Sequence, residues 1–154
     1  METADAKLRI AIFTDSFLPM ISGVVTATIN LARALADRGH FVLIVTPGAK
    51  KESFTYPNIR VESVASIRAH FYENFKWSAP FSPRIREIVK NEHIEVVHFM
   101  TPFTVSFVGI NIARALGLPV VGTFHTFISD PSNYRHFVRG RIFDVKEESV
   151  WHYS

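Results

Sequence analysis

Ser22 and Gly23 directly precede a helical pattern and form a candidate anion site. The start of a helix exposes unpaired backbone N–H groups and carries about half a positive charge. A glycine there lets a phosphate approach the backbone closely. The stretch lacks the lysine of a P-loop and the G-x-G-x-x-G pattern of dinucleotide-binding folds. Two interpretations therefore stay open: an anion cradle, or a glycine that only permits a turn.

Two histidines lie near the ends of predicted strands. His125 follows an apolar strand and is next to polar residues, which favours a functional role. His98 lies inside an apolar strand, where a structural role is more usual. Ligands of a parallel sheet bind at the carboxyl ends of its strands. Four residues are therefore expected to converge there: Asp15, Gly23, Thr101 and His125.

Short apolar stretches alternate with helical patterns along most of the chain. The predicted strands are residues 8–14, 41–46, 58–64, 94–99 and 120–124. They are apolar at both odd and even positions, as in strands buried on both faces. The predicted helices are residues 24–38, 83–92, 104–116 and 139–154. This alternation predicts an α/β fold with a doubly wound, Rossmann-like parallel sheet.

Helix ends and one irregular segment complete the expected structure. Ser82-Pro83 and Thr101-Pro102 are both typical of helix starts, and Gly39 is placed to end the first helix. Residues 104–116 carry apolar side chains around most of the helix, which predicts burial. Residues 68–80 fit no regular element and mix aromatic with basic side chains.

Composition excludes several classes of function. The 154 residues suit one domain, contain no cysteine and have a formal net charge of +3 without a long basic run. Nucleic acid is therefore not an expected partner. No apolar run reaches the ~18 residues of a membrane span, and the polar start does not resemble a secretory signal. We expect a cytoplasmic protein without metal or cofactor, and the absence of glutamine favours a thermophilic source.

Three stretches occur in a fixed order: "RIAIFTDSFLPMISGVVTATINLARALADRGHFVLIVTPG", "VVHFMTP" and "GLPVVGTFHT". Together they resemble the N-terminal domain of retaining glycosyltransferases of the GT-B class. That class includes phosphatidylinositol mannosyltransferases and diacylglycerol glucosyltransferases. The resemblance extends from Leu8 to about Gly140, which is most of the chain.

The resemblance implies a division of labour between two Rossmann-like domains that face a cleft. The N-terminal domain mainly holds a lipid or sugar acceptor, and a second domain mainly holds a nucleotide sugar. Residues 1–154 would be the first of these, without the second, and would be inactive alone. Gly23 and Val24 would approach the donor diphosphate, although Ser22 replaces a glycine found in many relatives. His125 would lie at the transferred sugar. The acceptor side would include Asp15, Thr101, Pro102 and Thr126.

Two expectations concern surfaces. Phe75, Lys76 and Trp77 suit contact with a lipid acceptor or a membrane surface, where aromatic rings insert and cations meet phosphates. The alternative is a loop that packs its rings on its own domain.

We also expect the isolated chain to self-associate, through the edge near residues 120–124 or through residues 139–154. The competing function is a self-contained phosphate- or nucleotide-binding module of the flavodoxin type, without catalysis.

Overall fold

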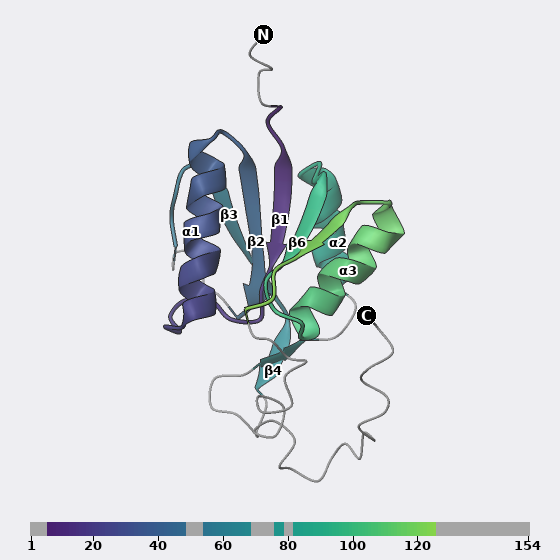
Figure 1. Cartoon of the computed structure of the whole chain (residues 1–154). Helices are drawn as coiled ribbons and strands as arrows, with labels where there is room; N and C mark the ends of the chain where they lie inside the picture. Colours follow the sequence, from purple (N-terminus) through teal and green to yellow (C-terminus); the bar gives the residue numbers. More distant parts are fainter. Residues whose placement is uncertain (1–5, 49–53, 69–75, 79–81, 126–154) are drawn as a thin grey trace, which may run out of the picture. The chain divides into compact units, whose positions relative to one another are not determined.

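A five-stranded parallel sheet is the main element of the described structure. The computed structural model describes residues 6–48, 54–68, 76–78 and 82–125. The chain divides into two compact units, Met1–Thr123 and Phe124–Ser154, and the sheet lies in the first. Its strand order is β3-β2-β1-β6-β7, with every neighbouring pair parallel (Figure 1). The strands are β1 (Arg9–Phe13), β2 (Phe41–Pro47), β3 (Ile59–Val64), β6 (Val96–Phe99) and β7 (Val120–Gly122).

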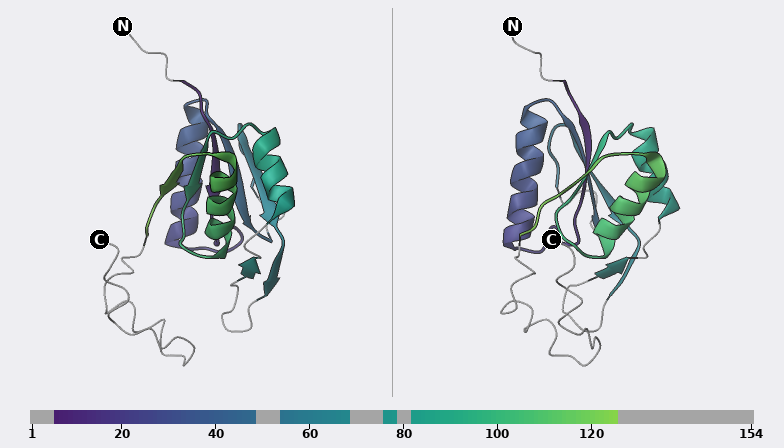
Figure 2. Two further views of the ribbon diagram at one scale, coloured as in Figure 1. Left: turned by 90° about the vertical axis from the view of Figure 1, so that its right-hand side faces the viewer. Right: turned by 45° about the vertical axis from the view of Figure 1, so that its right-hand side comes forward.

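Helices cover both faces of this sheet, which confirms the doubly wound Rossmann-like fold. Helix α1 (Gly23–Asp37) lies on one face, and α2 (Pro83–Asn91) and α3 (Thr104–Leu116) lie on the other (Figure 2). Strand β1 shows why both are needed. Ile12 faces the cluster of α1, whereas Phe13 faces the cluster of α2 and α3. Since both are 0% exposed, neither face of β1 meets water.

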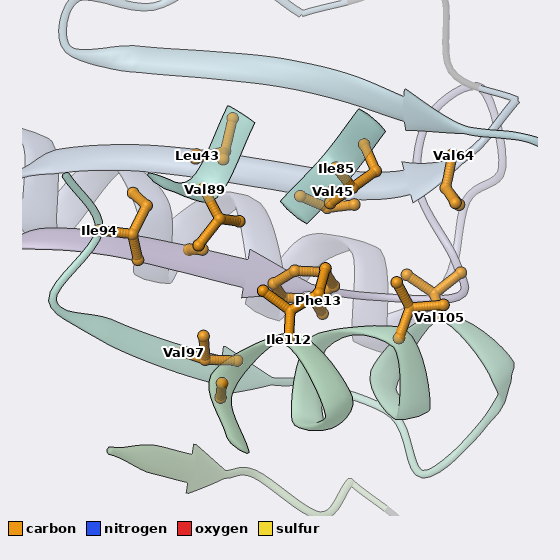
Figure 3. Packing of buried hydrophobic residues seen from close by; sticks show 13 residues of the cluster. Phe13, Leu43, Val45, Val64, Ile85, Val89, Ile94, Val97, Val105 and Ile112 are labelled. Carbon is orange, nitrogen blue, oxygen red and sulfur yellow. The ribbon is translucent and has the colours of Figure 1, made fainter. Parts of the chain in front are cut away.

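Phe13 lies at the centre of the core cluster beneath α3 (Figure 3). In Figure 3 it lies beside Ile112 of α3. A Cβ atom added to Gly109 would lie 2.6 Å from Cγ of the Phe13 ring. The absence of a side chain at Gly109 therefore lets α3 pack closely on β1.

Most predicted helix ends are confirmed. Ser82 caps α2, with its Oγ accepting from the Ile85 N–H (3.4 Å), and a proline follows it. Gly39 and Gly117 adopt left-handed conformations just after α1 and α3, with φ of 87° and 67°. The predicted helix of residues 104–116 is confirmed by α3, but Thr101-Pro102 is not its start. Helix α3 begins at Thr104, and its N-cap Phe103 makes no side-chain capping bond.

Residues 68–80 contain regular structure that the sequence did not predict. Strands β4 (Ser66–Arg68) and β5 (Lys76–Ser78) form a two-stranded antiparallel sheet. Each strand has only three residues, too few for an alternating pattern to be recognised. The pairing across the intervening segment, and not a local pattern, defines both strands.

Helix α3 is less buried than expected. Phe107 is 55% exposed and Phe103 is 39% exposed, whereas Val105 and Val108 are fully buried. The helix packs on one face of the sheet, so its opposite side is open among the described residues. At the sheet edge, β7 is exposed on both faces. The predicted helix at residues 139–154 lies outside the described residues.

Ion pairs join helix α2 and the residue after it to strands of the sheet. The fully buried Glu62 of β3 binds Arg60 and Arg84, each at 2.6 Å. Glu92, just after α2, binds Arg9 of β1 at 2.7 Å and Arg60 at 2.5 Å. A buried carboxylate needs such partners, because removing one leaves an uncompensated charge. Among the described residues, no helix combines the length and apolar character required to cross a membrane.

Candidate functional site: two helix starts at one sheet edge

Helix α1 starts with a partly open turn. Ser22 is the N-cap, and its Oγ accepts from the Val25 N–H at 3.3 Å. Within the described part of the chain, the N–H groups of Gly23 and Val24 donate to no protein acceptor. The first turn contains no acidic residue. These two donors and the helix dipole are therefore available to an anion from outside.

Nothing within the described structure requires glycine at position 23. A Cβ atom added to Gly23 would meet no atom within 4 Å. Its φ is not among the positive values found at Gly39, Gly48 and Gly117. Gly23 thus needs no left-handed turn conformation in the described structure, and its role in anion binding stays a prediction. Open space above the backbone is the condition for close approach of a phosphate.

Helix α3 starts with a carboxylate already in place. Asp15, two residues after β1, accepts from the Val105 N–H at 2.8 Å and from the Thr104 hydroxyl at 2.9 Å through Oδ1. Its Oδ2 accepts from the Thr101 hydroxyl at 2.9 Å. The Thr101 oxygen in turn accepts from the Asp15 main-chain N–H at 3.0 Å. Asp15 therefore caps α3 from a different element.

Burial dominates the electrostatics of this carboxylate. Asp15 is 5% exposed and Thr101 is 6% exposed. Desolvation raises the pKa of Asp15 above its usual value, and the hydrogen bonds from Val105, Thr101 and Thr104 partly oppose the shift. Both carboxylate oxygens are occupied by protein donors. The carboxylate is therefore held by donors from residues 101–105 of the protein itself.

His98 has a protein partner. Its Nε2 lies 2.8 Å from the Thr123 hydroxyl oxygen, across the β6–β7 pair. The ring is half-buried. This contact supports the structural role that the apolar strand favoured.

The structure brings together some of the predicted site residues. Asp15 and Thr101 are in direct contact, and Pro102 follows them, half-buried, in the turn before α3. Gly23 and Val24 form the first turn of α1. His125 is exposed and belongs to the second unit, so its convergence with the others stays a prediction.

The remaining predicted residues are described only in part or lie outside the described ranges. Lys76 and Trp77 lie in β5. Phe75 and Thr126 lie outside the described residues. In the ranges that the structure covers, there is no group of three or more histidine, aspartate and glutamate residues that could hold a metal ion.

Sequence reasoning missed Thr104 and the Val105 N–H as partners of Asp15. They lie 89 and 90 residues away along the chain. A threonine in a first helical turn is a weak indication of capping, and nothing local identifies its partner. The contact arises because β1 pairs with β6, which brings the residues after the two strands together.

A doubly wound parallel sheet with helices on both faces defines a Rossmann-like domain. Comparison with known proteins narrows this class. Residues 21–151 match the family model of Glycosyltransferase Family 4, so the chain belongs to that family.

Two relatives are named alpha-monoglucosyldiacylglycerol synthase. The one from Streptococcus pneumoniae is 30% identical over 150 residues, covering 90% of this chain and 34% of the relative. The one from Acholeplasma laidlawii is 34% identical over 133 residues, covering 85% and 32%. A GDP-mannose-dependent alpha-mannosyltransferase from Corynebacterium glutamicum is 24% identical, covering 84% and 32%. The chain thus spans about a third of the length of these relatives.

A solved glycosyltransferase from Rickettsia africae is also similar in structure. Its TM-score is 0.49 at 18% identity, and the match covers 85% of this chain and 33% of that one.

Proposed function

We propose that this chain is the acceptor-side domain of a retaining, GT-B-type glycosyltransferase that moves a sugar from a nucleotide-sugar donor to a lipid or carbohydrate acceptor. The observation that carries the proposal is the family match over residues 21–151. The names of the relatives support a glycolipid product and a nucleotide-sugar donor. A second Rossmann-like domain would supply most of the donor contacts.

The proposed reaction exchanges one bond of the sugar for another. The bond between the anomeric carbon and the donor diphosphate breaks, and a bond to the acceptor hydroxyl oxygen forms. The hydroxyl proton passes to the leaving diphosphate. Negative charge grows on the diphosphate as the sugar becomes cation-like. Fixed N–H donors and a helix dipole that face this charge lower the barrier.

The residues of this chain take separate roles in the proposal. The free N–H groups of Gly23 and Val24 bind the donor diphosphate. His125 hydrogen-bonds to the transferred sugar or its phosphate. Thr101, Pro102 and Thr126 line the acceptor side, and Asp15 belongs to that side by holding Thr101 in place.

A self-contained flavodoxin-type module is the competing function. The match to a glycosyltransferase family disfavours it. The chain as given is expected to transfer no sugar by itself. Measurable transfer by the purified 154 residues would contradict the division of labour between two domains.

The main experiment uses the two-domain protein that carries this chain. It is incubated with radiolabelled UDP-glucose or GDP-mannose and with vesicles that contain diacylglycerol or monoglucosyldiacylglycerol. The expected result is a labelled glycolipid with an α linkage, which means retention because the sugar of both donors is α-linked. Parallel incubations with soluble sugars distinguish a carbohydrate acceptor. The proposal would be overturned if no sugar were transferred from either donor to any of the acceptors.

We further propose peripheral contact with the cytoplasmic face of a membrane through residues 68–80, including Phe75, Lys76 and Trp77. A lipid acceptor makes such contact necessary, and aromatic and basic residues suit an interface. Vesicle sedimentation of the protein before and after Phe75→Ser and Trp77→Ser tests it. Equal binding by both forms would instead support a loop that packs on its own domain.

Self-association of the isolated chain is a separate proposal. Among the described residues, β7 pairs only with β6, and Val120 and Val121 are 40% and 49% exposed. An edge of this kind tends to pair with another chain. Light scattering at about 100 μM is expected to give a mass above that of one chain. The mass of a single chain at that concentration would rule it out.

A further inference from the structure

The contact between Asp15 and the start of α3 ties the acceptor-side turn to the loop whose far end, at Gly23 and Val24, the proposed function gives to the donor. Asp15 opens the loop that leads from β1 to the α1 start. Thr101 begins the turn that leads from β6 to α3. The two segments are held by three carboxylate contacts and one main-chain contact, all between 2.8 and 3.0 Å.

We propose that Asp15 is a positioning residue that fixes the donor-side loop before α1 against the acceptor-side turn before α3. This inference rests on the proposed function, because it concerns the alignment of the two substrates. Asp15 does so through Thr101, Thr104 and Val105, without touching either substrate.

The geometry supports positioning over direct contact. Oδ1 has two donors and Oδ2 has one, and all three come from the segment of residues 101–105. The residue is 5% exposed. The Asp15 main chain returns the contact by donating to the Thr101 oxygen. A carboxylate bound on both oxygens and at its own N–H cannot turn toward a substrate without losing these bonds.

The neighbouring main chain makes the link stiff. The Met100 N–H donates to the Phe13 carbonyl oxygen at 2.9 Å, and the Thr14 N–H donates to the Val45 carbonyl oxygen at 3.0 Å. Both strand ends are thus held immediately before the contact begins. Small errors in alignment are costly, because a misplacement of about 1 Å can lower a rate about 10²-fold.

Replacement of Asp15 separates positioning from chemistry. Asp15→Ala leaves the Val105 N–H without its acceptor and frees both segments. Asp15→Asn keeps an amide oxygen in the place of Oδ1, and its amide nitrogen can donate to the Thr101 oxygen. The asparagine therefore preserves the link but removes the charge. If Asp15 instead acted on a substrate as a base or an anion, the protein would lose activity in both variants.

The test measures steady-state kinetics of the two-domain protein together with hydrogen exchange of residues 14–22 and 100–107. Val89→Ala is the matched control, since Val89 is a fully buried core residue of α2 outside both segments. All proteins are compared at a temperature where each is folded. We expect Asp15→Ala to lower kcat about tenfold or more, with less than a threefold change in either KM. Exchange of both segments should become at least tenfold faster.

Asp15→Asn should recover most of both losses, and Val89→Ala should show neither. Unchanged exchange or kcat in Asp15→Ala would overturn the inference. So would a low kcat in Asp15→Asn with normal exchange, because the carboxylate would then act on substrate. If Asp15→Ala does not fold, Thr101→Val reports on the same link by the same measurements.

Failure of the proposed function is distinguishable from failure of this inference. If the unmodified protein transfers no sugar, the proposed function is wrong and exchange alone decides the inference. Faster exchange of both segments in Asp15→Ala, recovered in Asp15→Asn, would support it. Any other exchange pattern would overturn it.

Discussion

The starts of α1 and α3 follow the carboxyl ends of the neighbouring parallel strands β1 and β6, but they differ in the groups bound to their N–H donors. Among the residues that the structure describes, the N–H groups of Gly23 and Val24 at the α1 start have no protein acceptor, and Gly23 lies beside open space. The α3 start receives the Asp15 carboxylate. The positive end of α3 is therefore neutralised by the chain itself, whereas no acidic side chain lies in the first turn of α1. The comparison teaches that proximity to the sheet edge does not by itself make a helix start an anion site.

The largest expected effect comes from His125. If the open α1 start binds the donor diphosphate, His125→Ala should remove a hydrogen bond that strengthens in the transition state. Turnover of the two-domain protein should fall on the order of 10²-fold or more, with little change in the temperature of unfolding. His40→Ala is the matched control, since His40 contacts the Leu8 N–H far from the helix starts. Near-normal turnover would leave His125 without a catalytic role.

The next test closes the open helix start. Gly23→Val places a branched side chain where a phosphate is expected to approach. Donor kcat/KM should fall about tenfold or more. The free energy of unfolding should change by less than about 1 kcal/mol, because the position has free space and an ordinary φ. Asn30→Val adds the same side chain at an exposed position further along α1. Equal donor kinetics in both variants would mean that the open start does not bind the donor.

Gly109→Ala tests how closely α3 packs on β1. Its Cβ would meet the Phe13 ring at 2.6 Å. Overpacking of this kind costs about 1–3 kcal/mol, and the better helix propensity of alanine returns up to about 1 kcal/mol. We expect a net loss in the free energy of unfolding, measured by urea denaturation. An equal or higher stability would show that the ring and α3 can separate without cost.

The smallest expected effect is a pH dependence. Because desolvation raises the pKa of Asp15 in the folded protein, the folded state binds this proton more tightly than the unfolded state. The resulting stability is fully present below 3.8, the usual pKa, and is lost as the pH rises through the raised value. The free energy of unfolding of Asp15→Asn relative to the unmodified protein should therefore increase with pH over this window. A difference that is constant with pH, measured by urea denaturation, would contradict the shift.

The sequence predicted the parts of this structure that depend on local patterns. The five strands, the Ser82 cap and the left-handed Gly39 all follow from residue type and spacing. It also predicted that Asp15 and Thr101 converge, since both follow neighbouring strands. It did not predict that the two residues bind each other, nor that Asp15 caps α3.

The remaining differences arise from contacts distant in sequence. Strand β5 exists through its pairing with β4, and the exposure of Phe107 depends on what covers α3. A local pattern specifies neither. The sites differ in the same way: Gly23 is recognisable beside its helix, whereas the partner of Val105 is 90 positions away.

The sequence distance between Asp15 and Val105 also has a consequence for biosynthesis. About 90 residues must be added after Asp15 before its main-chain donor exists. At about 5–20 residues per second, this takes on the order of 5–20 s. The unit of β1, α1 and β2 is complete much earlier. In a growing chain, the α1 start can thus form while the Asp15 carboxylate is still hydrated. When α3 folds, it binds this carboxylate and buries it.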